Sequence, residues 1–252
     1  MSECAVITGG TGLIGRQLVG DFVAAGWKVV SISRDPGRAA ALAKDFGDRV
    51  LSLPIDLAEV GAAEEVVSKL AAHRVAPTVL VNNARAIDSL EVGVSGVTDR
   101  GQFLQEFTLQ VIAAYELATR CVESMSGLRS IINISSIYGS VPFNPRLYAD
   151  PDTGAPGPVS PIQYSVSKAA LEHLTRELAI RFAPQVLVNG VAFGGVYRDG
   201  DAEFERRYAR FCPQQRMLRV EEVSPPVLSL ASRAFSGMTG QILRYDGGWT
   251  VW

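Results

Sequence analysis

The sequence has little of what several classes of protein require. It contains three cysteines, Cys4, Cys121 and Cys212, which lie far apart and show no C-x-x-C spacing. An odd number of scattered cysteines fits free, reduced thiols better than a disulfide framework or a zinc site. The two histidines, His73 and His173, are too few for a histidine-rich metal site, so we expect no bound metal.

Charge and hydropathy exclude further classes. The formal net charge is −2, and the lysines and arginines form no basic run that would attract nucleic acid or an anionic membrane. No apolar run approaches the ~18 residues of a membrane-spanning helix, and Ser2-Glu3 leads directly into a strand pattern without a targeting segment. We therefore expect a cytoplasmic protein that acts on a small molecule, with neither nucleic acid nor membrane as a partner.

The sequence does contain a regular alternation of strand and helix patterns. Its 252 residues, 47% of them hydrophobic, suffice for one α/β domain, and we expect residues 1–252 to form it. Short β-branched runs separated by helical patterns predict a doubly wound, seven-stranded parallel sheet flanked by helices. The runs are CAVIT (4–8), KVVSIS (28–33), RVLSL (49–53), TVLVN (78–82), SIINIS (130–135), QVLVNGVA (185–192) and QILRY (241–245).

Residues at helix ends support this assignment. Asp35-Pro36 is typical of an N-cap followed by the first helical residue, and Gly26 is typical of the end of the preceding helix. Ser160-Pro161-Ile162-Gln163 predicts a capping box that opens a helix reaching about Phe182. Residues 140–161 hold six of the 13 prolines and predict a long inserted loop, a feature that is usually functional in a compact domain.

The stretch TGGTGLIG, residues 8–15, joins the first strand to an amphipathic helix. Glycines at such a turn let the backbone approach a pyrophosphate, whose charge the helix N-terminus stabilises. The turn predicts a dinucleotide site, although its spacing differs from G-x-G-x-x-G and an ordinary glycine-rich turn is the alternative interpretation of this motif alone. The candidate contacts are Gly9, Thr11, Gly12, Leu13, Ile14 and Gly15.

Tyr164 and Lys168 are four residues apart, so both side chains project from one face of the predicted helix. A tyrosine, with a reference pKa of about 10, needs a nearby cation to serve as an acid or base at neutral pH. Lys168 supplies that cation. The pair follows the strand that ends at Ser135-Ser136.

Together with NNA at 82–84 and DGG near the C-terminus, these motifs resemble the short-chain dehydrogenase/reductase family over essentially the whole chain. The resemblance implies a Rossmann fold and hydride transfer to or from a nicotinamide cofactor. It implies that Ser136 hydrogen-bonds the substrate oxygen, that Tyr164 exchanges the proton, and that Lys168 also holds the nicotinamide ribose. It further implies a homodimer or homotetramer packed through helices at 101–125 and 161–182, and cofactor contacts from Asp56, Leu57, Asn83, Ala84 and the backbone of Val196.

The chain departs from the family pattern at two candidate site residues. Gln110 aligns with the helix asparagine that takes part in a proton relay, and it offers the same amide one methylene further out. Arg85 stands where the family usually has glycine after N-N-A. It is either an exposed surface arginine or a clamp for an acidic or phosphorylated substrate.

The spacing of Ser136 and Tyr164 places the proline-rich insertion beside the active site, because both ends of the insertion adjoin catalytic residues. Tyr148 is the candidate substrate contact in it, with Arg146 and Asp150 as further polar groups; the alternative is that the segment serves only as a lid. The patterns SSIYG, GGV and DGGWT resemble a subgroup associated with bacterial surface-polysaccharide and flagellar sugar biosynthesis.

The cofactor preference is predicted from the end of the second strand. Ser33 occupies the position where NAD-specific relatives usually have aspartate, and Arg34 follows where NADP-specific relatives often have arginine. A guanidinium binds a 2′-phosphate with two charge-assisted hydrogen bonds, so NADP(H) is favoured over NAD(H). Asp35 would favour NAD(H) if the strand extended far enough for it to reach the ribose.

Three functions remain open on the sequence. The first is an oxidoreductase that interconverts an alcohol and a carbonyl, on a sugar or sugar nucleotide. The second is an epimerase or dehydratase that acts through a keto intermediate, which the T-G-x-x-G-x-x-G turn favours but the absence of a separate substrate domain opposes. The third is a non-catalytic NADP-binding regulator, which Gln110 and Arg85 favour but the retention of Ser136, Tyr164 and Lys168 opposes.

Overall fold

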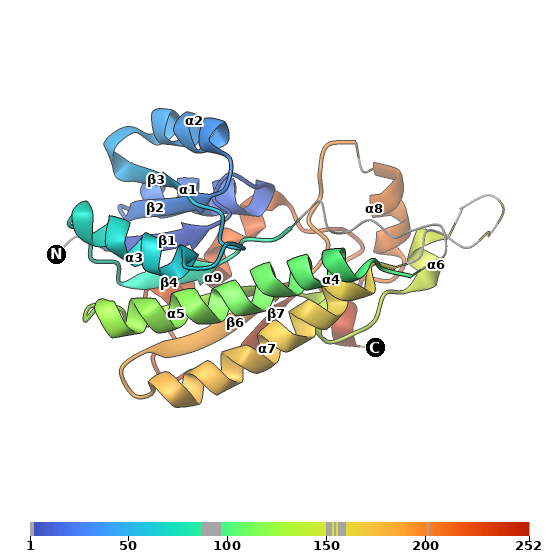
Figure 1. The fold of residues 1–252 in the computed structure, drawn as a ribbon. Helices are drawn as coiled ribbons and strands as arrows, with labels where there is room; N and C mark the ends of the chain where they lie inside the picture. The colour runs from blue at the N-terminus through green and yellow to red at the C-terminus, as the bar shows by residue number, and fades with distance from the viewer. Residues whose placement is uncertain are drawn as a thin grey trace.

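The computed structural model describes residues 3–86, 97–149, 153, 155, 160–200 and 202–251. Its described strands form a seven-stranded sheet in the order β3-β2-β1-β4-β5-β6-β7, in which every neighbouring pair is parallel. The prediction of a doubly wound parallel sheet is confirmed (Figure 1). The strands are β1 (Cys4–Thr8), β2 (Lys28–Ser33), β3 (Val50–Pro54), β4 (Val79–Asn82), β5 (Ser130–Ser136), β6 (Leu187–Phe193) and β7 (Ile242–Tyr245).

Helices cover both faces of the sheet, as parallel strands with two buried faces require. The larger helices are α1 (Leu13–Ala24), α2 (Pro36–Phe46), α3 (Ala62–Ala72), α4 (Arg100–Phe107), α5 (Ala113–Ser124), α7 (Ile162–Phe182), α8 (Ala202–Ala209) and α9 (Ser224–Ala231). Shorter turns are η1 (Gly47–Arg49), the π-turn η3 (Thr108–Ile112), η4 (Ile137–Gly139), α6 (Pro145–Tyr148), η5 (Val220–Glu222) and η6 (Trp249–Val251).

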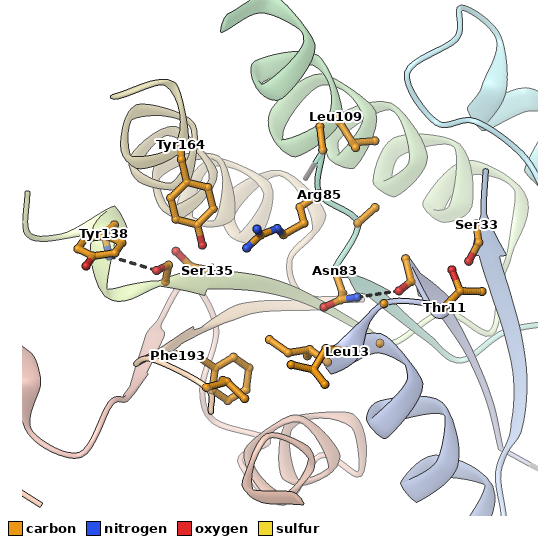
Figure 2. A pocket seen from close by; sticks show the side chains of 18 of the residues that line it. Thr11, Leu13, Ser33, Asn83, Arg85, Leu109, Ser135, Tyr138, Tyr164 and Phe193 are labelled. Carbon is orange, nitrogen blue, oxygen red and sulfur yellow. Dashed lines mark hydrogen bonds between the residues drawn. The ribbon is translucent and has the colours of Figure 1, made fainter. Parts of the chain in front are cut away.

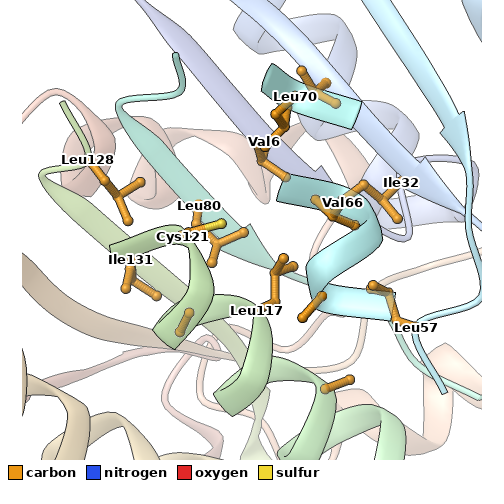
Figure 3. Close-up of a cluster of buried hydrophobic side chains, with 14 of the residues drawn as sticks. Val6, Ile32, Leu57, Val66, Leu70, Leu80, Leu117, Cys121, Leu128 and Ile131 are labelled. Carbon is orange, nitrogen blue, oxygen red and sulfur yellow. The ribbon is translucent and has the colours of Figure 1, made fainter. Parts of the chain in front are cut away.

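Two buried clusters hold the layers together. On one face, α3, α5 and α7 contribute Leu70, Leu117 and Leu178 to a cluster that includes strand residues such as Leu80 and Ile131. Figure 3 shows part of this cluster, with the side chains of α3 and α5 against β1, β4 and β5. On the other face, α1, α2 and α9 contribute apolar side chains against the same strands. All three cysteines are unpaired and buried.

This topology fixes where a ligand binds. The chain moves outward from β1 to β3, then returns to β4 on the other side of β1 and continues to β7. In open α/β sheets, ligands bind at the carboxyl ends of the strands where the order reverses, here between β1 and β4. The turns that follow β1, β4 and β5 therefore meet at one edge of the sheet.

The predicted helix ends are correct at one place and wrong at another. Asp35 is the N-cap of α2, and its carboxylate accepts a hydrogen bond from Arg38 N at 3.0 Å. The capping box at Ser160 is wrong, because α7 begins at Ile162 with Pro161 at the cap position and no side-chain cap. The Gln163 side chain instead accepts from Thr98 Oγ1 at 2.9 Å, so a tertiary contact replaces the local one. The predicted end at Phe182 is confirmed.

The insertion at 140–161 is not a loop throughout. Its first half contains α6, whose N-cap Asn144 accepts from Arg146 N at 3.1 Å and whose Leu147 is fully buried. Asp150 and most of the following residues to 159 lie outside the described residues.

In the described part of the chain, no helix is long and apolar enough to cross a membrane, and no group of three His, Cys, Asp or Glu residues could hold a metal ion.

Candidate active site

A cavity of about 630 Å³ runs along the carboxyl ends of the strands. Its lining comes from the turns after β1 to β6, from the start of α7 and from α8. Most of the sequence-predicted site residues therefore lie in one place, namely Gly9, Thr11, Gly12, Leu13, Ile14, Gly15, Ser33, Arg34, Asp56, Leu57, Asn83, Ala84, Arg85, Ser136, Tyr148, Tyr164 and Val196. Lys168 and Gln110 are buried next to this lining rather than in it.

The glycine turn forms one end of the cavity. Gly9 has a φ of +68°, which favours glycine, and Gly12 N donates to Gly9 O at 3.0 Å, which closes the turn before α1. Gly15 packs so tightly on the turn that an added Cβ would lie 2.1 Å from Gly9 O. The first N–H groups of α1 have no acceptors within the helix, so they are available to an anion at this end of the cavity.

The end of β2 lines the adjoining part of the cavity. β2 ends at Ser33, as predicted, and Ser33 Oγ is a buried atom with no hydrogen-bond partner in the described structure. Arg34, Asp35 and Arg38 follow along the same wall. Arg38 donates from its guanidinium to Thr11 O, and it was not singled out from the sequence. The Asp35 carboxylate is engaged at the start of α2.

The end of β4 is fastened to β1 across the switch point. The Thr8 hydroxyl accepts from Asn83 N and Ala84 N, each at 2.9 Å, and Asn83 Nδ2 donates to Thr8 O at 2.9 Å. Asn83 thus fixes the turn that presents Ala84 and Arg85 to the cavity (Figure 2). Asp56 shapes the turn after β3 in a similar way, since its carboxylate accepts from Ala58 N at 3.0 Å.

Ser135 and Ser136 face different surroundings. Ser135 Oγ donates to Glu172 Oε1 at 2.9 Å and so joins a buried network. Ser136 Oγ accepts from Tyr138 N at 3.3 Å and contacts the Tyr164 hydroxyl, where it helps to lower the pKa of Tyr164. Of the two serines, Ser136 is therefore the one beside Tyr164.

Burial raises the pKa of Tyr164 above its usual value, and the nearby Arg85 guanidinium opposes this effect. Arg85 Cζ lies 5.5 Å from the centroid of the Tyr164 ring, and Lys168 Nζ lies 5.8 Å from it. Figure 2 shows the Arg85 guanidinium turned toward Tyr164. Two cations therefore flank this phenol, where the sequence had predicted only Lys168 in that role.

Lys168 is held by a buried chain of polar groups. Its Nζ donates to Gln110 Oε1 at 2.8 Å and to Ile134 O at 2.6 Å. Gln110 Nε2 donates to Glu106 Oε1 at 3.0 Å, so the amide connects lysine and carboxylate. Burial lowers the pKa of Lys168 to about 7, while the charges of Glu106 and Glu172 act against this shift.

Gln110 lies within the π-turn η3, which separates α4 from α5. Such π-turns occur frequently at functional sites. Glu106 was missed in the sequence, although its position four residues before Gln110 is the spacing that places two side chains on one helix face.

Aromatic side chains line the other end of the cavity. Tyr138 stacks on Phe143 with ring centroids 3.8 Å apart, and its hydroxyl is 2.8 Å from that of Tyr148. Phe204 packs against Tyr148 with ring centroids 5.6 Å apart. We call Tyr138, Phe143, Tyr148 and Phe204 the aromatic wall. Among these residues, only Tyr148 was identified from the sequence; the aromatic character of YGSVPF (138–143) was the available signal for two others.

Val196 lies on the turn after β6 and lines the cavity. It pairs with Leu218 in an isolated bridge, whose hydrogen bonds run from Tyr197 N to Leu218 O and from Leu218 N to Gly195 O, each at 2.8 Å. The turn is therefore held to the body of the protein by the residues on either side of Val196. Phe193 and Gly194 also line the cavity at this turn.

Comparison with models of known protein families shows which family the chain belongs to. A family model described as short chain dehydrogenase matches residues 3–148, and one described as enoyl-(acyl carrier protein) reductase matches residues 153–250. The chain belongs to the short-chain dehydrogenase/reductase family. The fold and the predicted family resemblance are thereby confirmed.

Several members of the short-chain dehydrogenase/reductase family resemble the whole chain. A galactitol 2-dehydrogenase (L-tagatose-forming) of Cereibacter sphaeroides is 30% identical, over 99% of this chain and 95% of that protein. An uncharacterized short-chain type dehydrogenase/reductase of Sinorhizobium fredii is also 30% identical. The match covers 97% of this chain but only 43% of the length of that protein. A gluconate 5-dehydrogenase of Burkholderia cenocepacia, solved with NADP and tartrate, superposes with a TM-score of 0.84 at 24% identity, covering 100% and 97% of the two chains.

Proposed function

We propose that this short-chain dehydrogenase/reductase is an NADP(H)-dependent oxidoreductase that interconverts an alcohol and a carbonyl on a sugar, a sugar nucleotide or a sugar alcohol. The observation that supports it most is the placement of Ser136 and Tyr164 together on the wall of the dinucleotide-type cavity, with Lys168 buried beside them. Galactitol 2-dehydrogenase, whose name states a polyol substrate, is similar to the whole chain.

The described residues fit a nicotinamide dinucleotide. The glycine turn and the start of α1 would hold the pyrophosphate, and the unpaired Ser33 Oγ with Arg34 and Arg38 would receive the 2′-phosphate of NADP. An acidic residue at the end of β2 would repel that phosphate, and Asp35 is instead engaged as the N-cap of α2. These features support NADP(H) over NAD(H).

The remaining cofactor contacts come from the turns at the carboxyl ends of the strands. In this proposal Asp56 and Leu57 border the adenine side, Asn83 and Ala84 border the ribose that joins the nicotinamide, and the Val196 backbone adjoins the nicotinamide itself. When bound, the cofactor supplies or accepts the hydride. Every other task of the reaction belongs to side chains of this chain.

Those tasks are binding, orientation and proton transfer. In the oxidation direction, the Ser136 hydroxyl holds the substrate oxygen and the Tyr164 oxygen takes its proton, as the hydride leaves the adjacent carbon. In the reverse direction, the Tyr164 hydroxyl returns the proton to the carbonyl oxygen. Lys168, held by Gln110 and the Ile134 carbonyl, places a positive charge beside Tyr164 and adjoins the ribose.

The substrate lies between this proton-transfer group and the aromatic wall. Tyr148 and Arg85 line the same cavity as Ser136 and Tyr164, so both are placed to contact a polyhydroxylated substrate. The aromatic faces of the wall offer a surface for the apolar face of a sugar ring. The resemblance to the subgroup of bacterial surface-sugar biosynthesis makes a sugar or sugar nucleotide the preferred substrate class within this proposal.

We further propose that the chain assembles as a homodimer or homotetramer in the cytoplasm, through the helices that contain residues 101–125 and 161–182. These helices carry exposed apolar side chains, which favour burial against a second copy. They are Leu104, Ile112, Tyr115, Ile162, Val166 and Ile180. Size-exclusion chromatography with light scattering, on the wild type and on Ile180→Glu, tests the assembly.

The function is tested by incubating the purified protein with NADP⁺ or NADPH and a panel of sugar alcohols, ketoses, sugar nucleotides and simple carbonyls. Net change in the absorbance of the reduced nicotinamide, with one oxidised or reduced product, supports the oxidoreductase. An isomerised or dehydrated product without net cofactor change would instead identify an epimerase or dehydratase. Tight cofactor binding with no product from any substrate would favour the non-catalytic regulator.

A further inference from the structure

Arg85 occupies a position in the site that its place in the sequence does not reveal. It follows β4 by three residues, after the Asn83 that fastens this turn to β1. Its Cζ lies 5.5 Å from the Tyr164 ring centroid, and its side chain lines the same cavity as Ser136 (Figure 2). The guanidinium therefore lies against the Tyr164 ring, and it also interacts with the hydroxyl that exchanges the substrate proton.

The other cation near Tyr164 is engaged elsewhere. Lys168 Nζ gives hydrogen bonds to Gln110 Oε1 and to Ile134 O, neither of which is a group of the cavity wall. Burial also lowers the pKa of Lys168 to about 7, so the charge of this ammonium depends more on pH than that of a guanidinium. A guanidinium stays charged over this whole range. Of the two cations, Arg85 is thus the one that lines the cavity and whose charge does not change with pH in this range.

Among the residues that the structure describes, few other charges face the phenol. The ionisable groups that act on Tyr164 or adjoin it are Arg85, Lys168, Glu106, Tyr138 and Tyr148. Arg85 is the largest influence that lowers the pKa of Tyr164, while burial and the charge of Glu106 raise it. The two other tyrosines add no positive charge.

Arg85 also retains capacity for a further contact. Its Nε is a buried atom without a hydrogen-bond partner in the described structure. A buried donor in this state calls for a specific explanation, and a catalytic role at the edge of this cavity is one.

We propose that Arg85 is a catalytic residue of this enzyme, whose guanidinium stabilises the negative charge on the Tyr164 oxygen and on the substrate oxygen next to it. This inference rests on the proposed oxidoreductase function. During oxidation, the alcohol O–H bond breaks and its proton goes to the Tyr164 oxygen, while the carbon-bound hydrogen leaves with its electron pair to the bound nicotinamide. The developing C=O then has Ser136 as hydrogen-bond donor and Arg85 as counter-charge.

The test compares variants that change charge at constant size. Arg85→Met removes the charge, Arg85→Lys keeps it, and Arg100→Met is the matched control because Arg100 is an exposed arginine at the start of α4. The first readout needs no substrate or cofactor: the ionisation of Tyr164 is followed by NMR with tyrosine isotope-labelled at Cζ, with its signal assigned by loss in Tyr164→Phe. The second readout is the pH dependence of kcat for alcohol oxidation.

We expect Arg85→Met to raise the pH at which Tyr164 ionises by about one unit and to reduce the oxidation rate below that pH about tenfold. Arg85→Lys should keep both the pH of Tyr164 ionisation and the oxidation rate near their wild-type values. Arg100→Met should match the wild type in both. Unchanged Tyr164 ionisation in Arg85→Met would overturn the inference, even in an active oxidoreductase. A shifted ionisation in a protein that oxidises no alcohol would support Arg85 and contradict the proposed function. If Arg85→Met does not fold, Arg85→Gln, which also removes the charge and keeps most of the side chain, provides the same comparison.

Discussion

Lys168 Nζ and Gln110 Oε1 are 2.8 Å apart, although their residues are 58 positions apart in the sequence. The same amide receives Lys168 on its oxygen and donates to Glu106 from its nitrogen. Both neighbours of Gln110 are buried and ionisable, so the amide is the link that orients Lys168 beside Tyr164.

Replacing Gln110 with leucine should reduce kcat by about tenfold or more, with little change in KM, since Lys168 loses its acceptor while the substrate contacts remain. Gln110→Asn, which restores the shorter family amide, should retain more activity than leucine. Thermal denaturation of both variants separates a catalytic loss from unfolding. A leucine variant with wild-type kcat would show that this contact is dispensable.

The cofactor preference is expected to reverse when the end of β2 is changed. Ser33→Asp with Arg34→Ala introduces a carboxylate for the ribose hydroxyls and removes a phosphate ligand, so the double variant should bind NADH more tightly than NADPH. The wild type should show the opposite order in Kd, measured by fluorescence titration. Arg38→Met, made separately, should weaken NADPH binding more than NADH binding, because Arg38 lines the same part of the cavity. Tighter binding of NADH by the wild type would refute the NADP assignment.

An ion pair outside the cavity, in which the carboxylate is buried and the guanidinium partly exposed, is expected to contribute to stability. Arg244 on β7 donates two hydrogen bonds to Glu172 on α7, at 2.7 and 3.0 Å, and the Glu172 side chain is 4% exposed. Arg244→Met leaves this carboxylate buried without its cation and should lower the free energy of unfolding by about 3 kcal/mol. The exposed pair of Arg16 and Asp45 is the matched control, and Arg16→Met should cost less than about 1 kcal/mol. If urea unfolding gave the same loss of unfolding free energy for Arg244→Met and Arg16→Met, the larger contribution expected of the Arg244–Glu172 pair would be contradicted.

Acid unfolding should depend on Glu222. Arg216 donates to both oxygens of this carboxylate, at 2.6 and 2.8 Å, and lowers the pKa of Glu222 to about 2. A depressed pKa contributes stability above the ordinary value near 4.5, which is lost as the pH falls toward the folded value. Glu222→Gln should therefore be less stable than the wild type at about pH 6, and the difference should shrink toward about pH 3. A difference that stays constant over this range in urea titrations would rule out Glu222 as the cause.

The sheet was predictable because parallel strands buried on both faces leave continuous β-branched runs in the sequence. All seven predicted strands differ from the observed ends by at most two residues at either end, and CAVIT and KVVSIS match β1 and β2 with no difference. The α7 start was not predictable from local signals, because Gln163 pairs with Thr98 rather than capping its own helix. Local patterns do not reveal such a partner.

The candidate site likewise contains residues that local motifs reveal and residues that only tertiary packing brings together. The turn glycines, Ser136, Tyr164 and Lys168 belong to motifs and were identified as a group. Glu106 and the aromatic wall depend on how α4, α6 and α8 pack against β5 and α7, which no short motif encodes. The position of Arg85 against Tyr164 likewise follows from the packing of the turn after β4 beside the start of α7, and it could not be inferred from the residue after N-N-A alone.

The central claim is that Tyr164 carries the proton in an alcohol–carbonyl oxidoreduction. The most direct measurement is kcat for the substrate identified in the panel, together with Kd for NADPH, in the wild type and in Tyr164→Phe, which removes one oxygen and little contact area. The proposal predicts a fall in kcat of at least about 100-fold with Kd for NADPH nearly unchanged. Turnover by Tyr164→Phe at close to the wild-type rate would contradict it.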